Sequence, residues 1–109
     1  MRTPIEIKIS AEVPLGNEYA EYHVPANGKK FTIVKFFGEA AFSKNSVVKL
    51  LWDYNAAGEQ ILWSIKGSSS MPLNIELTGD GVKKLAIALD NGELGSVFMS
   101  GYVLILQED

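Results

Sequence analysis

The sequence predicts an all-β protein, an antiparallel two-sheet sandwich of about eight strands. Turn-forming residues recur roughly every 8–12 positions, which is typical of a sandwich or barrel. Between the turns, apolar and polar residues alternate with a period of two, and β-branched and aromatic residues are common. The best helical candidate, Gly38–Phe42, is one turn at most. A jelly roll is the favoured arrangement and an immunoglobulin-type sandwich is second, with residues 1–109 forming one domain.

The first half of the chain supplies four predicted strands, over residues 5–10, 19–24, 31–36 and 47–54. The second of these is short and polar, which suits the edge of a sheet. Phe36 and Phe37 are consecutive, so one of the two rings must point away from the core. Trp52 is in phase with Val48 and Leu50, which predicts that its ring is buried.

The second half supplies four more predicted strands, over residues 61–66, 73–78, 84–90 and 96–106. Trp63 is in phase with Ile61 and Ile65, so we expect it in the core as well. Gly67–Ser70 reads as a flexible polar connection, and Gly79–Gly81 as a hairpin turn.

The last predicted strand is apolar on both faces. Successive side chains of a strand point to opposite sides. Val103 and Ile105 therefore share one side, and Tyr102, Leu104 and Leu106 share the other. Both sides must leave water, and a chain of 109 residues has little material left to cover the second. Another copy of the chain would cover it.

Other apolar residues also occupy the polar phase of their strands, and Ala86 and Ala88 stand where charges are expected. Contiguous apolar patches mark interfaces, and about 800 Å² per subunit is the usual size of a specific one. We expect a closed homo-oligomer, with a trimer favoured by analogy with other sheet sandwiches. The candidate self-association residues are Val47, Leu51, Leu62, Phe98, Tyr102, Leu104 and Leu106.

Aromatic residues outside the predicted core could instead contact a docking partner or stack on a sugar. Phe37 and Phe42 flank a short segment that forms a second candidate contact surface. The candidate docking or ligand-contact residues are Tyr19, Tyr22, Phe37, Phe42 and Tyr54.

Composition argues against several classes of partner. A net charge of −3, with lysines in isolated pairs beside turns, does not favour nucleic acid. No apolar run approaches the ~20 residues that span a bilayer. The segment Met1–Glu6 lacks the apolar core of a signal peptide, so we expect a product made in the cytoplasm. The absence of cysteine excludes disulfides and thiol chemistry.

No constellation of residues predicts catalysis, a cofactor or a metal. His23 is the single histidine, and we interpret it as structural. The pairs Glu18/Glu21 and Glu6/Glu12 could serve a glycosidase only across a cleft that a chain this short hardly builds. A calcium site remains an alternative, built from turn residues at one end of the sandwich: Asp80, Asp90, Asn91 and Glu93. We expect a protein that is not an enzyme.

The C-terminal third resembles the closing hairpins of small jelly-roll proteins of tailed bacteriophages. The similar stretches are Leu77–Leu85, Ile87, Leu89–Asn91 and Met99–Tyr102. Such proteins are head-decoration, head-fibre or tail accessory proteins. The resemblance implies a homotrimeric virion component that docks on a capsid or tail protein. A carbohydrate-binding sandwich for host or glycan recognition is the alternative, and outside a virion we expect the protein in the cytoplasm.

Overall fold

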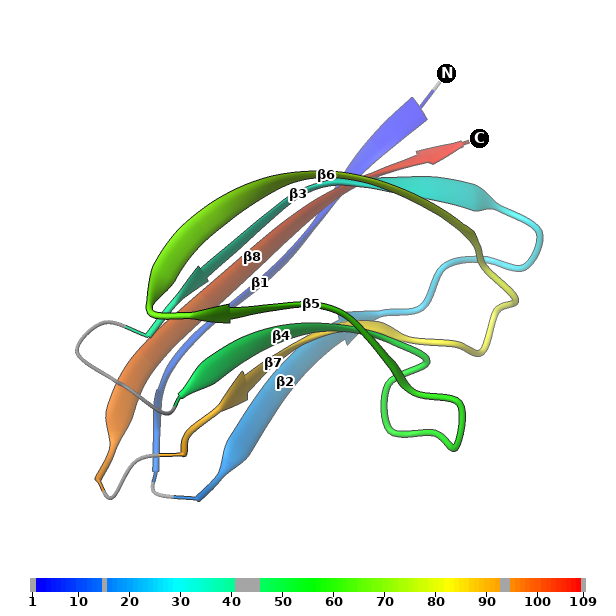
Figure 1. Ribbon diagram of the computed structural model, residues 1–109. Coiled ribbons are helices and arrows are strands. Elements are labelled where there is room, and N and C mark those ends of the chain that lie inside the picture. The colour runs from blue at the N-terminus through cyan, green and yellow to red at the C-terminus, as the bar shows by residue number, and fades with distance from the viewer. Residues whose placement is uncertain (1, 15, 41–45, 93–94, 109) are drawn as a thin grey trace.

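The computed structural model consists of eight β-strands (Figure 1). It describes residues 2–14, 16–40, 46–92 and 95–108. The prediction of an all-β sandwich is confirmed. The strands are β1 (Arg2–Val13), β2 (Glu18–His23), β3 (Lys30–Glu39), β4 (Val47–Trp52), β5 (Gln60–Lys66), β6 (Ser68–Thr78), β7 (Leu85–Asp90) and β8 (Val97–Glu108).

The strands form two four-stranded sheets that pack face to face. One sheet, here the β8 sheet, has the order β1-β8-β3-β6; the other, here the β7 sheet, has the order β2-β7-β4-β5. All neighbouring strands are antiparallel. This double-sheet order is that of a jelly roll. Consecutive strands β1 and β2 edge one flank of the sandwich, while β5 and β6 edge the opposite flank (Figure 1).

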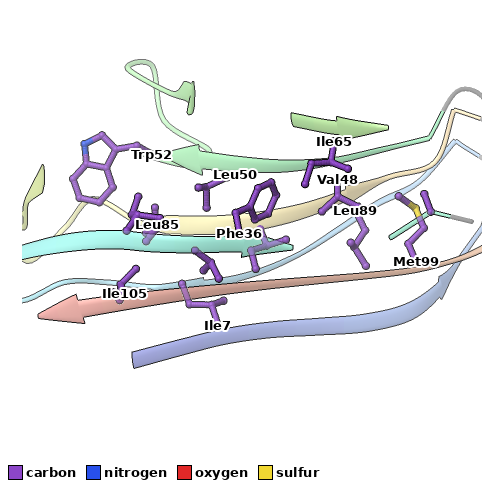
Figure 2. Packing of buried hydrophobic residues seen from close by; sticks show 14 of the residues in the cluster. Ile7, Phe36, Val48, Leu50, Trp52, Ile65, Leu85, Leu89, Met99 and Ile105 are labelled. Carbon is purple, nitrogen blue, oxygen red and sulfur yellow. The ribbon is translucent and has the colours of Figure 1, made fainter. Parts of the chain in front are cut away.

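The core fills the space between the sheets, as the alternating patterns predict (Figure 2). Val48 and Leu50 of β4 face Phe36 of β3, and all three are fully buried. The ring centroids of Phe31 and Trp52 lie 5.5 Å apart across the two sheets, so the buried position expected for Trp52 is confirmed. The other fully buried large side chains come mainly from β7 and β8: Leu85, Ile87, Leu89, Met99, Val103 and Ile105.

The structure corrects the prediction for the edge strand β5. Trp63, expected in the core, is 41% exposed, and Ile61 is 62% exposed. The pairing of β4 with β5 shifts between Leu50 and Leu51, so that Leu62 becomes an extra residue in β5. The bulge puts Ile61 opposite Leu51, on the outer face. Trp63 pairs with Leu50 and keeps the inner phase of Ile65, but β5 is an edge strand and leaves its ring partly open to solvent. Leu62, expected on the outer face, packs against the core.

Three connections also differ from the sequence prediction. Gly79–Gly81, expected as a hairpin turn, joins β6 to β7, which lie in different sheets and do not pair. The polar segment after Gly67 belongs to β6, which begins at Ser68 and pairs with β3 from Glu39 onward. Gly67 itself makes the turn, with a φ of 76° that favours glycine. Gly38 and Glu39 are strand residues of β3 rather than a helical turn. No helix among the described residues is long or apolar enough to cross a membrane.

Candidate functional site: the outer face of the β8 sheet

The outer face of the β8 sheet carries an apolar stripe that nothing in the described part of the chain covers. Tyr102, Leu104 and Leu106 lie half-buried along β8, on the side away from the core. Phe37 of β3 pairs with Tyr102 and is also half-buried. Phe98, at the start of β8, lies on the same face and is 63% exposed. These five residues are called the apolar face below.

The pairing of the strands shows which residues lie beside this stripe. Leu104 pairs with Lys35 of β3, which in turn pairs with Pro72 of β6, and Leu106 pairs with Pro4 of β1. Pro4 therefore adjoins the stripe, whereas Pro72 is separated from it by the exposed side chain of Lys35. Pro4 could not be placed beside the stripe from the sequence, because that requires the register of β1 against β8.

Charged side chains border the apolar face on both neighbouring strands. On β1 the outward residues opposite Leu104 and Tyr102 are Glu6 and Lys8. On β3, Glu39 follows at the position opposite Ser100. An apolar centre within a polar rim is the usual arrangement of a protein interface.

Tyr102 is held in place by a polar contact at its tip. Its hydroxyl is hydrogen-bonded to the Glu6 carboxylate on β1, which raises the pKa of Tyr102 above its usual value, and the nearby negative charge acts in the same direction. The bond links the tip of the Tyr102 side chain to the neighbouring strand β1. It restrains Tyr102 before any partner arrives, which lowers the entropic cost of burying this side chain.

The remaining self-association candidates lie on the β7 sheet and do not join the apolar face. Val47 is half-buried at one end of the outer surface. Leu51 points outward as expected, but it is only 2% exposed because it packs with Ala86 and Ala88. Leu51 therefore offers almost no surface to a partner. Leu62 faces the core, as described above.

Tyr54 is the residue that closes over this second, smaller cluster. It belongs to the turn after β4, where Asp53 and Asn55 have φ values of 59° and 61°. These left-handed conformations reverse the chain, and the Tyr54 N–H donates to the carbonyl of Lys84 at 3.2 Å. Tyr54 packs against the cluster of Leu51, Ala86 and Ala88, so it is half-buried rather than a free platform.

A charged group borders the same cluster. The Lys49 Nζ atom lies 3.2 Å from an Asp90 carboxylate oxygen and 3.8 Å from a Glu18 oxygen. Burial lowers the pKa of Lys49, but the hydrogen bond to Asp90 and the charge of Glu18 outweigh it and leave the pKa raised. Burial raises the pKa of Tyr54, and the charges of Glu18 and Glu59 add to this.

The aromatic candidates for docking or ligand contact do not share one surface. Tyr19 and Tyr22 are exposed on β2, but they pair with Leu89 and Ala86, which face opposite sides of the sheet. The Lys84 Nζ atom lies 4.7 Å from the centre of the Tyr22 ring. Phe37 joins the apolar face instead, and Phe42 lies outside the described residues.

The turn residues proposed for the alternative calcium site do not come together in the described part of the chain. Asp80 precedes β7 and Asp90 ends it, so the two carboxylates lie at opposite ends of that strand. Asp80 accepts the backbone N–H groups of Val82 and Lys83 at 2.9 Å and 2.7 Å, as turn residues do. Among the described residues, no cluster of three or more metal-binding side chains occurs. Glu93 lies outside those residues.

Asn91 has a structural role that the sequence did not indicate. Its side-chain amide donates to the carbonyls of Val13 and Gly95, both at 2.8 Å, and its oxygen accepts the hydroxyl of Ser46 at 3.2 Å. It thereby joins the end of β1 to the residues before β4 and β8. Asn is common in turns for many reasons, so its presence in the sequence could not reveal these distant partners.

Comparison with known proteins places the fold but gives no relative in sequence. No protein-family model and no curated protein sequence matches the chain. A similar solved structure is that of the Bacillus endospore appendages, described as a novel family of disulfide-linked pili. The TM-score is 0.50 at 7% sequence identity, over 98% of this chain and 88% of the other. At this identity the similarity concerns the fold alone.

Proposed function

We propose that the protein is a non-enzymatic building block that self-associates through the apolar face and docks on a larger assembly. The observation that carries this proposal is the position of Tyr102, Leu104 and Leu106: they lie on the outer side of a central strand, and no layer of the described chain packs on them. Central strands of a two-layer sandwich normally turn polar residues outward. The departure from this rule favours a partner.

The size of the sandwich is consistent with this role. Its principal extents are 44 × 27 × 18 Å, so each broad face exceeds the ~800 Å² per partner of a typical specific interface. A symmetric copy placed on the apolar face would bury Phe98, Tyr102 and Leu104 together. Aromatic residues of this kind dominate the binding energy of most interfaces.

The pilus subunits of similar fold show that such a sandwich can serve in a polymer. Those pili are described as disulfide-linked. The present chain has no cysteine, so its copies must be held together without disulfides. We infer that buried apolar surface provides the attraction here.

The assembly on which the protein docks is proposed from the resemblance of the C-terminal third of the sequence to phage accessory proteins. A decoration or accessory protein of a tailed-phage virion, present as a homotrimer, would use the apolar face between copies and its loops toward the shell. Localisation by imaging of an intact particle tests this part of the proposal. Absence from every purified particle would reject it.

The self-association itself is tested by substitution on the apolar face. We expect Leu104→Asp to dissociate the oligomer, because a buried unpaired carboxylate costs several kcal/mol. Sedimentation velocity would show the loss of mass, and far-ultraviolet circular dichroism would show that the fold persists. Ala57→Asp is the matched control, since Ala57 is exposed in the turn between β4 and β5, on the other sheet. A folded Leu104→Asp variant with unchanged mass would show that another surface is used.

Carbohydrate binding is the second candidate function. Tyr22 is 48% exposed on the outer surface of the β7 sheet, where Tyr54 also lies. The Lys84 side chain over the Tyr22 ring occupies the position that a sugar would take. A glycan array with the wild type and with Tyr22→Ala distinguishes the two roles: binding that Tyr22→Ala abolishes would favour the module, and a silent array would reject it.

A further inference from the structure

The free edges of the β7 sheet carry most of the exposed apolar residues that lie off the apolar face. Among the described residues, the exposed large hydrophobic side chains number six, and four of these are on the edge strands of this one sheet. Ile61 and Trp63 belong to β5, and Tyr19 and Tyr22 belong to β2. The two strands lie on opposite flanks of the sandwich (Figure 1).

The two sheets differ in how their edges are protected. Proline has no N–H to offer an incoming strand, and natural proteins place it on edges for this reason. Pro4 lies in β1 and Pro72 in β6, so both edges of the β8 sheet are interrupted. Neither β2 nor β5 contains proline. The edges of the β7 sheet are therefore better able to accept another strand.

We propose that β5 of one copy pairs with β2 of the next copy, extending the β7 sheet from chain to chain. The directions of the strands allow this. Neighbours in the order β2-β7-β4-β5 are all antiparallel, so β2 and β5 run in opposite directions. A copy displaced sideways by one sheet width presents its β2 antiparallel to β5, which is the geometry of strand addition.

The rows of the sheet also predict the register. Glu18 pairs with Asp90, which pairs with Val47, which pairs with Lys66. If the next copy continues this row across the sheet, Glu18 of that copy lies beside Lys66 of the first copy. Opposite charges at the two ends of a row fix register and direction more than they add affinity.

The same register matches the exposed apolar residues. The row that begins at Tyr22 passes through Ala86 and Leu51 and ends at Ile61. In the extended sheet, Tyr22 of the next copy would lie beside Ile61, which is 62% exposed in the single chain. An aromatic side chain beside a β-branched one is a favourable cross-strand pair. The bulge at Leu62 accommodates the seventh residue of β5 against six in β2, as it does against β4.

This contact is heterologous, since two different edges meet, and it forms a ring or an open filament according to the rotation between copies. The inference deepens the proposed self-association and rests on it in part. The edge contact and the apolar face use different sheets, however, so the two can fail separately.

Cysteine cross-linking tests the pairing directly, because the wild-type chain has no cysteine to give a background. The middle row runs from Ala20 through Ala88 and Lys49 to Ser64. Under mild oxidation, Ala20→Cys/Ser64→Cys should give a ladder of dimers, trimers and larger species on a non-reducing gel. The matched control is Ala20→Cys/Asn74→Cys, because Asn74 is exposed on β6 at the same flank. No ladder, or an equal ladder from the control, would overturn the inference.

Charge exchange gives a second, independent test. Glu18→Lys and Lys66→Glu should each weaken association roughly tenfold or more, because each places like charges side by side. An equimolar mixture of the two variants should regain association, because the carboxylate introduced at position 66 of one chain then meets the ammonium group introduced at position 18 of the other. Failure of the mixture to recover would contradict the register.

The outcome in the Leu104→Asp background separates the two interfaces. A cross-linked ladder in that background supports edge pairing without the apolar face. If the wild type associates through the apolar face while Ala20→Cys/Ser64→Cys gives no ladder, the edge contact is rejected and the proposed function stands. A wild type that stays monomeric in every assay rejects both.

Discussion

Gly38 and Gly101 pair across β3 and β8, and both face the β7 sheet at the point where Val48 packs. A Cβ atom on Gly101 would lie 2.5 Å from Ile87 Cγ2 and 3.2 Å from Val48 Cγ1, and one on Gly38 would lie 2.9 Å from Val48 Cβ. The missing side chains let the two sheets approach closely at this point. β3 and β8 therefore contribute no core side chain at positions 38 and 101.

Gly101→Ala should therefore lower the free energy of unfolding. Alanine in a strand is ordinarily more stable than glycine by about 0.5–1 kcal/mol, but a clash in a packed core costs about 1–3 kcal/mol. We expect the clash to win, because the nearest atoms belong to the fully buried Ile87. Urea denaturation at one protein concentration measures the change. Gly95→Ala is the control, since nothing lies within 4 Å of its added Cβ; a stable Gly101→Ala variant would mean that the sheets are more loosely packed than described.

Asn91→Ala should destabilise the protein by about 2–3 kcal/mol, because the buried carbonyl of Val13 and that of Gly95 lose their donor. The measurement is again a urea midpoint. Asn74→Ala, on the exposed side of β6, should change stability by less than about 0.5 kcal/mol. Equal effects from the two substitutions would show that Asn91 does not join the strand ends.

The lowered pKa of Asp80 predicts that the free energy of unfolding decreases in acid. Hydrogen bonds from the backbone N–H groups of Lys83 and Val82 hold the pKa of Asp80 below its usual value of 3.8. The folded state therefore binds the proton less readily than the unfolded state. The resulting stability is present above pH 3.8 and is lost as the pH falls through the lower, folded pKa.

A pH series of denaturation curves for the wild type and Asp80→Asn checks this expectation. The advantage of the wild type should be greatest near neutral pH and should shrink below about pH 4. A difference that does not vary with pH would mean that the carboxylate charge contributes nothing to the turn.

The raised pKa of Tyr102 predicts a loss of stability at alkaline pH. The hydrogen bond to Glu6 raises its pKa, so the folded state favours the protonated phenol. The stability from this bond is present below pH 10 and is lost as the pH rises through the raised pKa. Ultraviolet titration should show one tyrosine ionising later than in Glu6→Gln. Identical titrations of the two proteins would mean that Glu6 does not hold the ring.

The alternating pattern predicted the core strands well, and it failed where the chain departs from regular pairing. The core positions of Leu85, Ile87 and Leu89 were predicted correctly, because β7 is a central strand and its pairing is regular throughout. The burial predicted for Trp63 was wrong because β5 is an edge strand, and Ile61 is exposed because the bulge at Leu62 turns it to the outer face. Neither feature can be read from the composition of that strand. Leu51 is buried in a cluster with Ala86 and Ala88, against which Tyr54 packs from a turn with left-handed residues on both sides of the tyrosine. That turn geometry could not be read from the alternating pattern.

The candidate site could be predicted in part for the same reasons. The stripe of Tyr102, Leu104 and Leu106 follows from the period of a single strand, so the sequence contains it fully. The contributions of Phe37 and Pro4 depend on which strands flank β8, and that is a property of topology. The proposed pairing of β2 with β5 of the next copy could not be derived from the sequence, because it requires the order and register of all four strands of the β7 sheet.

The mass of the wild-type protein in dilute solution tests the central claim most directly. Sedimentation equilibrium over a range of low micromolar concentrations should give a multiple of the 11.9 kDa chain. A mass of one chain at every concentration, with the apolar face of β8 open to solvent, would contradict the account.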